Sequence, residues 1–250
     1  MNPHAPRPPA PFAPPPPPGP DGVLLVDKAG GPTSHDVVAS VRRRFRLRKV
    51  GHGGTLDPQA TGLLVLLLGR ATKLSGRFLT SDKTYEGVLR LGVSTDSQDA
   101  QGQVLRESDP AAAGVTAERL AAEMAQRTGD VYQTPPMVSA VKVEGVPLYK
   151  RARRGQTIER EARLVHVYEF KLLGYECPRA RFRVKCSKGT YVRTLGSEVG
   201  DALGCGASLE ALRRLESGSL RVEDAHPLET VLAWDRAELE RHLLPLRRFI

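Results

Sequence analysis

One segment of the chain combines the residue types that a reactive site needs. Residues 51–62, GHGGTLDPQATG, place Asp57 after three glycines and directly before Pro58, with His52 nearby. Glycine allows the backbone to approach a ligand closely, and proline stiffens the chain after the aspartate. The result is one carboxylate held on a rigid, crowded loop beside a histidine. The alternative is an aspartate that only accepts hydrogen bonds from amides of its own turn, but the surrounding pattern favours the reactive interpretation.

The elements before this loop must position it. Residues 23–26 form a short apolar run that predicts a strand, and a glycine-proline turn follows. Thr33 or Ser34 can then cap a helix. The apolar residues of that helix repeat at helical spacing on one face, and they are Val37, Val38 and Val41.

Apolar periodicity and turn residues mark the later elements. The predicted strands are 84–91, 163–173 and 181–186, and the predicted helices are 116–127, 199–203, 209–215 and 228–244. The apolar run 63–68 has the length of a buried strand or a buried helix. Strands and helices mix without regular β-α-β alternation. The sequence therefore predicts an α/β (α+β) fold with a mixed, largely antiparallel sheet flanked by helices.

The charge of the chain indicates a polyanionic partner. The 37 basic and 28 acidic residues give a formal net charge of +9, and nucleic acid is the first candidate partner for such a protein. Basic residues cluster at Arg42 to Lys49, at the end of the first predicted helix, and at Lys150 to Arg154. Cations favour a helix C-terminus, but the first cluster exceeds that need, which favours phosphate contact. The alternative for both clusters is a solvated basic surface.

The composition of the chain also indicates how its domains are organised and in which cellular compartment we expect it. Residues 1–20 are dominated by proline and predict a disordered or extended tail, which leaves residues 21–250 as the folded domain. No run approaches the ~18 apolar residues of a membrane helix. An odd number of cysteines without C-x-x-C spacing argues against a disulfide framework or a zinc site and favours a reducing cytoplasm. We expect these cysteines to be buried or half-buried: Cys177, Cys186 and Cys205.

The segment 51–62 resembles the active-site motif of bacterial tRNA pseudouridine-55 synthases of the TruB type, G-H-x-G-[TA]-L-D-P-x-A-T-G, and every fixed position is met. The resemblance continues along the folded chain, with Arg70 standing where the family more often has Glu. The other matching segments are 22–28, 33–36, 69–73, 83–97, 133–149, 186–194 and 203–214.

The resemblance implies the pseudouridine synthase fold and the isomerisation of a uridine in the T-loop of tRNA, at position 55. It assigns Asp57 as the catalytic nucleophile, with stabilisation of charge as the alternative role, and Arg193 as the cation that pairs with it. Tyr85 corresponds to the tyrosine that stacks on the flipped base and moves a proton; the alternative is a half-buried strand tyrosine. The reaction detaches uracil, rotates it and rejoins it through carbon, so we expect no cofactor and no metal.

The resemblance also implies substrate-binding residues. Tyr191 and Leu212 correspond to residues that line the uracil pocket. His52 corresponds to the histidine that enters the RNA loop and helps displace the target base. A family-specific RNA-binding insertion is expected over about 109–180. The remaining predicted substrate-binding residues are basic, and they are Lys28, Lys150, Arg153 and Arg154.

The chain departs from the family at its end, because the sequence resembles the close of the catalytic domain and predicts no C-terminal PUA-like domain. The expected partner is tRNA through its T-arm, without a membrane, and the family suggests a monomer. One competing hypothesis is an RNA-folding helper, a role that also fits beside catalysis. A synthase for ribosomal RNA and a DNA-binding protein are the others; no helix-turn-helix, zinc or basic-zipper signature supports the last.

Overall fold

The computed structural model describes residues 19–137, 139, 142–143, 146–147, 156 and 158–249. The predictions made for Lys150, Arg153 and Arg154 lie outside the described residues, as does most of the proline-rich segment 1–20.

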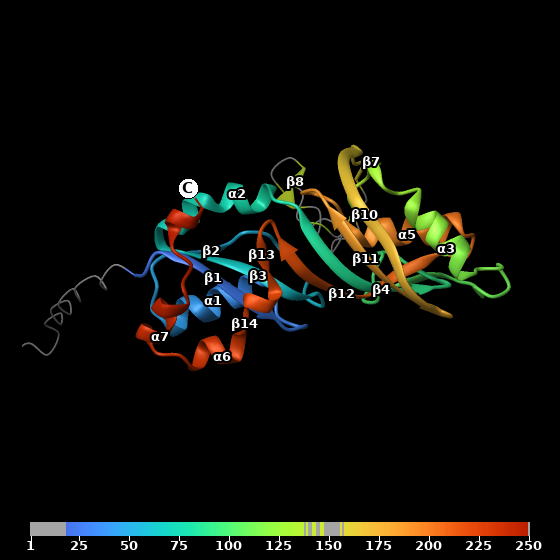
Figure 1. Ribbon diagram of the computed structural model, residues 1–250. Helices are drawn as coiled ribbons and strands as arrows, with labels where there is room; N and C mark the ends of the chain where they lie inside the picture. The colour runs from blue at the N-terminus through green and yellow to red at the C-terminus, as the bar shows by residue number, and fades with distance from the viewer. Residues whose placement is uncertain are drawn as a thin grey trace, which may run out of the picture.

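A long sheet organises the molecule, and its strands run in the order β14-β1-β3-β12-β4-β11-β10-β7, with β2 paired to β3 and β13 to β12. Only the β1–β14 and β3–β12 pairs are parallel among the described pairings of this sheet. Figure 1 shows β12 and β4 crossing the middle of the molecule. The strands are β1 (Gly22–Lys28), β2 (Val50–His52), β3 (Thr61–Leu68), β4 (Lys83–Leu91), β7 (Gly129–Gln133), β10 (Arg163–Glu176), β11 (Arg179–Cys186), β12 (Ala207–Ser217), β13 (Leu220–Arg221) and β14 (His226–Pro227).

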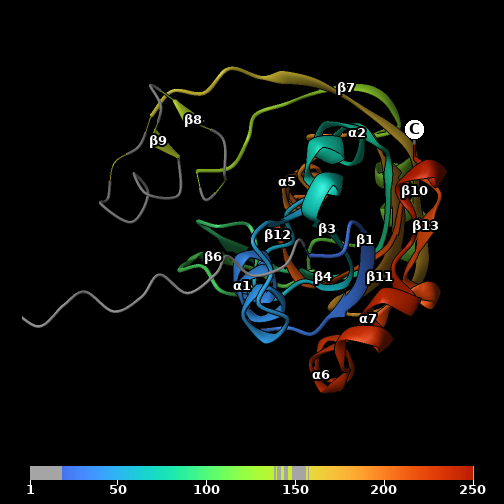
Figure 2. The same cartoon turned by 90° about the vertical axis from the view of Figure 1, so that its left-hand side faces the viewer.

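Two small hairpins project from the same side of this sheet (Figure 2). They are β5 (Val93–Thr95) with β6 (Val104–Glu107), and β8 (Lys142–Val143) with β9 (Val146–Pro147).

Helices bury the apolar faces of the sheet in three clusters. Helices α3 and α5 pack over β4, β10, β11 and β12, with Leu120, Phe182 and Leu195 fully buried between them. Helix α1, with α6 and α7, covers one face of β1 and β3, while α2 and η1 cover the other. The helices are α1 (Ser34–Arg44), α2 (Ser75–Thr80), α3 (Ala117–Ala125), α5 (Val192–Ala202), α6 (Leu228–Ala233) and α7 (Arg236–His242), with 3-10 turns η1 (Gly69–Leu74), η2 (Val222–Asp224) and η3 (Leu246–Arg248).

Helix α1 shows how local chemistry sets these elements. Thr33 is its N-cap, and the Asp36 side chain accepts a hydrogen bond from the Thr33 backbone, which completes a capping box. The predicted valine face is buried against the β-strands. The predicted mixed, largely antiparallel sheet flanked by helices is confirmed.

The prediction of a helix at 209–215 was wrong, because this segment is the middle of β12. Leu209, Leu212 and Leu215 recur every third residue, as on a helix. In the structure, β12 pairs with β4 through register shifts at Leu209/Ala211 and Arg214/Glu216. Each extra residue of a β-bulge interrupts the two-residue alternation of a strand, so the bulged strand acquires a helix-like spacing.

Two further segments and one cysteine differ from the predictions. Within the range 109–180, which was expected as an insertion, β7 and β10 are strands of the main sheet. The predicted helix 228–244 is two helices that end and begin around Trp234. Cys177 is exposed, whereas the other two cysteines are buried.

Within the described part of the chain, no helix is long and apolar enough to cross a membrane. The same residues contain no group of three or more His, Cys, Asp or Glu side chains that could hold a metal ion.

Gly62 joins the reactive loop to the sheet, and we predict that it tolerates no side chain. Its φ is +96°, and a β-carbon there would lie 2.3 Å from the carbonyl oxygen of Arg214. Gly31 is a matched control with φ of +107° and no atom within 4 Å of the added carbon. Both Gly→Ala variants carry about 1–2 kcal/mol of left-handed strain.

We expect Gly62→Ala to lose a further ~1–3 kcal/mol through the overpacked contact. Urea unfolding of the two variants measures the difference. Equal stability losses would contradict the close packing of β3 against β12.

Candidate active site

The loop that bears Asp57 is fixed to α1 at one point. The Ser34 hydroxyl accepts a hydrogen bond from the Leu56 amide at 2.8 Å and lies 3.1 Å from the Leu56 carbonyl, to which it donates. Ser34 is buried in the first turn of α1, and Leu56 and Ala60 pack into the apolar cluster beneath. The residue directly before Asp57 is therefore held by both backbone groups and by its side chain.

Arg214 supports the other side of the loop from the bulged part of β12. Its guanidinium donates to the carbonyls of Gly54 at 3.2 Å, Thr55 at 3.3 Å and Leu63 at 2.7 Å. The side chain is 2% exposed, so these carbonyls are satisfied by a buried cation. Sequence analysis missed this role, because a strand arginine next to Arg213 gives no signal that distinguishes it.

Lys28 does not lie where it was predicted. It was expected to bind substrate, but it is fully buried and donates to the carbonyls of Ala29 at 2.9 Å, Pro32 at 2.9 Å and Pro58 at 2.8 Å. Burial lowers the pKa of Lys28 to about 8, although the nearby Asp57 carboxylate opposes the shift. Lys28 therefore ties the turn after β1 to the residue that follows Asp57, and no side-chain atom remains available to RNA.

Asp57 and Arg193 form an ion pair. The Arg193 Nε lies 3.0 Å from an Asp57 carboxylate oxygen. The Arg193 side chain is 5% exposed, whereas that of Asp57 is 39% exposed. The arginine is thus a fixed, desolvated cation, and the carboxylate that it holds keeps one side open to an incoming molecule.

A second carboxylate, that of Asp99, also contacts Arg193. Arg193 Nη1 donates to the Ser97 carbonyl at 2.8 Å and lies 3.3 Å from Asp99 Oδ2. Asp99 is buried and also accepts hydrogen bonds from Ser97 Oγ and Gln59 Nε2. Sequence analysis did not identify Asp99, because only the folded chain brings it to Arg193.

The segment around Asp99 is itself clamped to α5. Gln98 has a φ of +64°, in the left-handed region that non-glycine residues seldom adopt. Its side-chain carbonyl accepts a hydrogen bond of 2.8 Å from the Thr194 hydroxyl. Thr194 follows Arg193 directly in α5. The first turn of this helix therefore holds three consecutive loop residues, Ser97, Gln98 and Asp99, through hydrogen bonds.

The charge balance at Asp57 is set by opposing effects. Burial is the largest and raises its pKa, Arg193 and Lys28 lower it, and Asp99 raises it again. The net pKa lies above the ordinary value for aspartate. A raised pKa means a more basic and less solvated carboxylate than one on the surface.

A cavity of about 340 Å³ opens beside this ion pair, within the range of small-molecule sites. Asp57, Tyr85 and Arg193 share it with Tyr191 and Leu212, so five of the predicted site residues meet around one space. Burial raises the pKa of the Tyr85 hydroxyl. Ser139, whose buried hydroxyl has no hydrogen-bond partner among the described residues, also lines the cavity.

His52 lies outside this set of lining residues. It ends β2, is partly exposed, and its Nδ1 accepts a hydrogen bond of 3.3 Å from the Gly54 amide. Burial lowers its pKa, and Arg214 and His35 lower it further. His52 is therefore an uncharged side chain at neutral pH, at the start of the loop that leads to Asp57.

A family model described as "TruB family pseudouridylate synthase (N terminal domain)" matches residues 42–192. The chain belongs to the TruB family. A second model, "tRNA pseudouridylate synthase B C-terminal domain", matches residues 193–250 of this TruB-family protein. The fold does not separate the two matched segments, because β12 of the second lies between β3 and β4 of the first. As a pseudouridine synthase, the TruB-family protein is an isomerase.

Individual relatives agree with this family. The chain is 50% identical to "tRNA pseudouridine synthase B" of Opitutus terrae over 226 residues, which cover 90% of this chain and 93% of the relative. It is 47% identical to the protein of that name from Burkholderia pseudomallei, over 90% of this chain and 74% of the relative. The fold is similar to that in "Crystal Structure of a Cbf5-Nop10-Gar1 Complex", with a TM-score of 0.71 and 30% identity, where this TruB-family chain spans 60% of the solved chain.

The Thr194–Gln98 clamp generates a prediction for the TruB-family site. Thr194→Val keeps the side-chain shape but removes the hydroxyl that Gln98 accepts from. Arg193 is then held less firmly, and since its guanidinium lowers the pKa of Asp57, that pKa should rise further. The measurement is the pH titration of the Asp57 carboxyl carbon by NMR.

Thr194→Ser is the matched control, because it retains the hydroxyl and should titrate as the wild type does. A Thr194→Val protein with an unchanged Asp57 titration would show that the clamp does not position Arg193.

Proposed function

We propose that this TruB-family enzyme converts uridine 55 in the T-loop of tRNA to pseudouridine, with Asp57 as the nucleophile that acts on a flipped-out nucleotide. One observation supports this most directly: a partly exposed Asp57 carboxylate, braced by the buried Arg193 guanidinium, faces a cavity lined by Tyr85, Tyr191 and Leu212. The names of the relatives support tRNA as the substrate class.

The proposed chemistry uses the ionised form of Asp57. The carboxylate attacks C1′ of the ribose, a C1′–O bond forms, and the C1′–N1 bond breaks, so that the electron pair leaves with uracil. The detached ring turns within the cavity until C5 faces C1′. A C1′–C5 bond then forms as the carboxylate leaves, C5 loses its proton, and N1 gains one. The sum is an isomerisation without an external reductant or oxidant.

The remaining cavity residues act on the ring. Tyr85 stacks on the uracil and takes part in moving the proton from C5, which its position in the lining of the cavity supports. Tyr191 and Leu212 form a wall that excludes water, which protects the intermediate from hydrolysis. Arg193 keeps the departing Asp57 carboxylate charged and oriented.

The RNA must present its nucleotide outside the stack for this chemistry. His52 enters the loop and offsets part of the unstacking free energy, which base-modifying enzymes must supply. Lys150, Arg153 and Arg154 contact the phosphates of the same loop. A tRNA-folding activity can accompany the modification, since binding the loop and opening it do not depend on Asp57 chemistry.

Replacing the nucleophile should separate binding from catalysis. Asp57→Asn keeps the shape and removes the charge, so pseudouridine formation should fall by at least about a thousandfold while tRNA binding persists. The measurement is site-resolved pseudouridine mapping on a tRNA transcript, with binding measured on the same samples. Asp224→Asn, an exposed carboxylate on η2, is the control and should stay near wild-type activity.

A product at a uridine other than 55 would overturn the site assignment. Retained activity in Asp57→Asn would overturn the nucleophile. Retained folding assistance without modification would establish two functions.

The pH dependence tests the ionised state of Asp57. Its pKa is raised by burial, and only the deprotonated form attacks. The single-turnover rate should therefore fall as the pH drops through that raised pKa, at a higher pH than for an ordinary aspartate. Arg193→Met removes a charge that lowers the pKa of Asp57, so the acid limb should move to higher pH. An acid limb that stays in place or moves to lower pH would contradict the proposal that pairing with Arg193 sets the ionisation of Asp57.

A further inference from the structure

The cavity beside Asp57 contains a polar group that the chemistry proposed above does not use. It is the hydroxyl of Ser139, a residue that is 6% exposed and lines the cavity together with Asp57 and Tyr191. Its Oγ is buried and has no hydrogen-bond partner among the described residues. A buried hydroxyl without a hydrogen bond destabilises a folded protein, so its presence in a cavity indicates a partner that arrives with a ligand.

Two cations of the same cavity differ from Ser139, because they already have acceptors within the protein. Arg214 donates to three carbonyls of the carboxylate loop and its anchor, as described above. Lys83 is 7% exposed and donates to three backbone carbonyls, as many as an ammonium has N–H groups. These acceptors are Phe78 at 2.9 Å, Leu79 at 3.2 Å and Ser81 at 2.5 Å. Both cations therefore serve the fold.

The stretch that leads to Ser139 is fixed to the N-terminal end of α5 by a two-point contact. Gln133, the last residue of β7, is 2% exposed. Its side-chain carbonyl accepts a hydrogen bond of 2.7 Å from the Tyr191 amide, and its side-chain amide donates to the Tyr191 carbonyl at 3.1 Å. Two buried prolines follow, Pro135 and Pro136, and each restricts the backbone. This stretch is thereby tied to Tyr191, which lines the same cavity.

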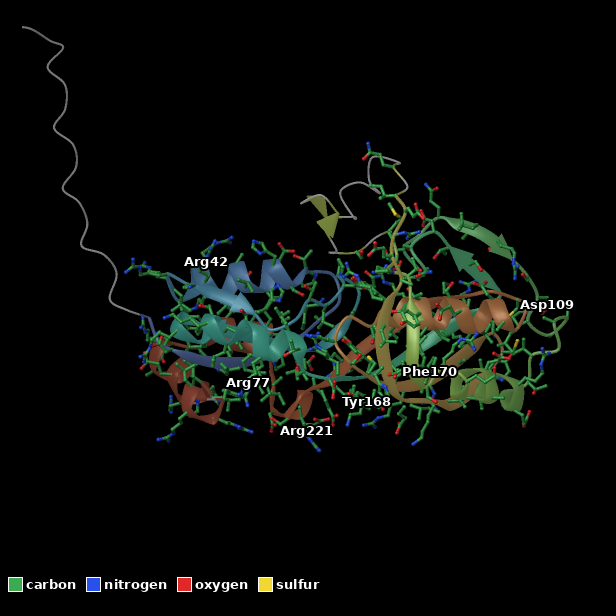
Figure 3. The ribbon with its side chains drawn as sticks, turned by 90° about the horizontal axis from the view of Figure 1, so that it is seen from above. Arg42, Arg77, Asp109, Tyr168, Phe170 and Arg221 are labelled. Atoms are coloured by element: carbon green, nitrogen blue, oxygen red, sulfur yellow. The ribbon has the colours of Figure 1, made fainter. Side chains whose placement is uncertain are left out.

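Ser139 lies between β7 and β8, outside the strands of the main sheet. In Figure 3, the small β8–β9 pair lies between the labelled side chains of Arg42, on α1, and Asp109, along the length of the molecule. Tyr85 and Leu212, in contrast, are carried by β4 and β12 of the main sheet. A small change at Ser139 therefore leaves the strands that bear the other cavity residues intact.

The proposed substrate supplies acceptors of the kind that this hydroxyl lacks. Uracil carries a carbonyl oxygen at C2 and another at C4, on either side of its N3–H group. When the nucleotide leaves its stack and enters the cavity, these atoms lose their water partners and require new ones. Leu212 offers only apolar contact, and a serine hydroxyl can donate to a carbonyl oxygen.

A carbonyl partner also suits the rotation of the detached ring. A half turn about the axis through N3 and C6 brings C5 to the former position of N1 and exchanges the two carbonyl oxygens. A donor that meets one carbonyl oxygen before the turn therefore meets the other one after it. Ser139 can hold the ring in both orientations without moving.

We propose that the Ser139 hydroxyl donates a hydrogen bond to a carbonyl oxygen of the flipped uracil, before and after the ring turns. This inference rests on the proposed function, which places uracil in the cavity beside Asp57. Ser139 is then a substrate-binding residue that holds the polar edge of the ring, while Tyr85 and Leu212 contact its faces.

The stability of the free protein gives the first test. Ser139→Ala should not lower the midpoint of thermal unfolding, because the lost hydroxyl makes no hydrogen bond within the described residues. Ser34→Ala is the matched comparison, since its hydroxyl makes two hydrogen bonds to Leu56, and its midpoint should fall by about 2–4 °C. A similar fall in Ser139→Ala would show that the hydroxyl already has a partner in the free protein and would overturn the proposal.

The affinity for RNA gives the second test, in the Asp57→Asn background so that the RNA is not modified during the measurement. Four tRNA transcripts carry uridine, 2-thiouridine, 4-thiouridine or pseudouridine at the target position. Ser139→Ala should weaken binding of the uridine and pseudouridine transcripts by the same factor, about three- to tenfold. It should weaken binding of one thio transcript much less, because sulfur is a poor acceptor.

Equal weakening on all four transcripts would show that the hydroxyl does not meet a carbonyl oxygen, and no weakening on the uridine transcript would show that it does not meet the substrate. A loss confined to the uridine transcript would contradict a contact that survives the turn. The proposed function is judged separately, by whether the wild-type protein forms pseudouridine in the uridine transcript, so the two failures are distinguishable.

Discussion

The ion pair between Asp57 and Arg193 is the interaction on which the site depends. A guanidinium that is almost wholly buried needs more than one partner to offset its desolvation, and here it has the Asp57 carboxylate, the Ser97 carbonyl and Asp99. The consequence is a rigid arginine with a carboxylate on each side, of which only Asp57 reaches the cavity. Burial and Asp99 raise the basicity of Asp57 while Arg193 limits the rise.

A second principle of the site is that buried cations organise the backbone. Lys28 and Arg214 together donate to the carbonyls of Pro58, Gly54 and Thr55, on both sides of Asp57. A loop rich in glycine has high conformational freedom in the unfolded chain, so it requires such fixed donors to adopt one shape. Lys28, one of the cations predicted to bind RNA, is therefore part of the internal support of the loop.

Much of the local structure could be predicted from the sequence, because its signals are local. The cap and valine face of α1 follow from residue spacing, and the motif at 51–62 marked the reactive loop. The bulged strand at 209–215 could not be predicted, since its leucines repeat with the period of a helix. The burial of Lys28 and the contact of Asp99 with Arg193 depend on segments that are distant in sequence, and no local pattern encodes them.

The insertion of β12 between β3 and β4 has a consequence for how the protein is made. Arg214, which fixes the carboxylate loop, and Leu212, which closes the cavity, both arrive on this late strand. Until the ribosome has released it, the preceding 206 of the 250 residues lack the strand that joins β3 to β4 and the Arg214 donors that fix the loop. The site is therefore completed only near the end of synthesis.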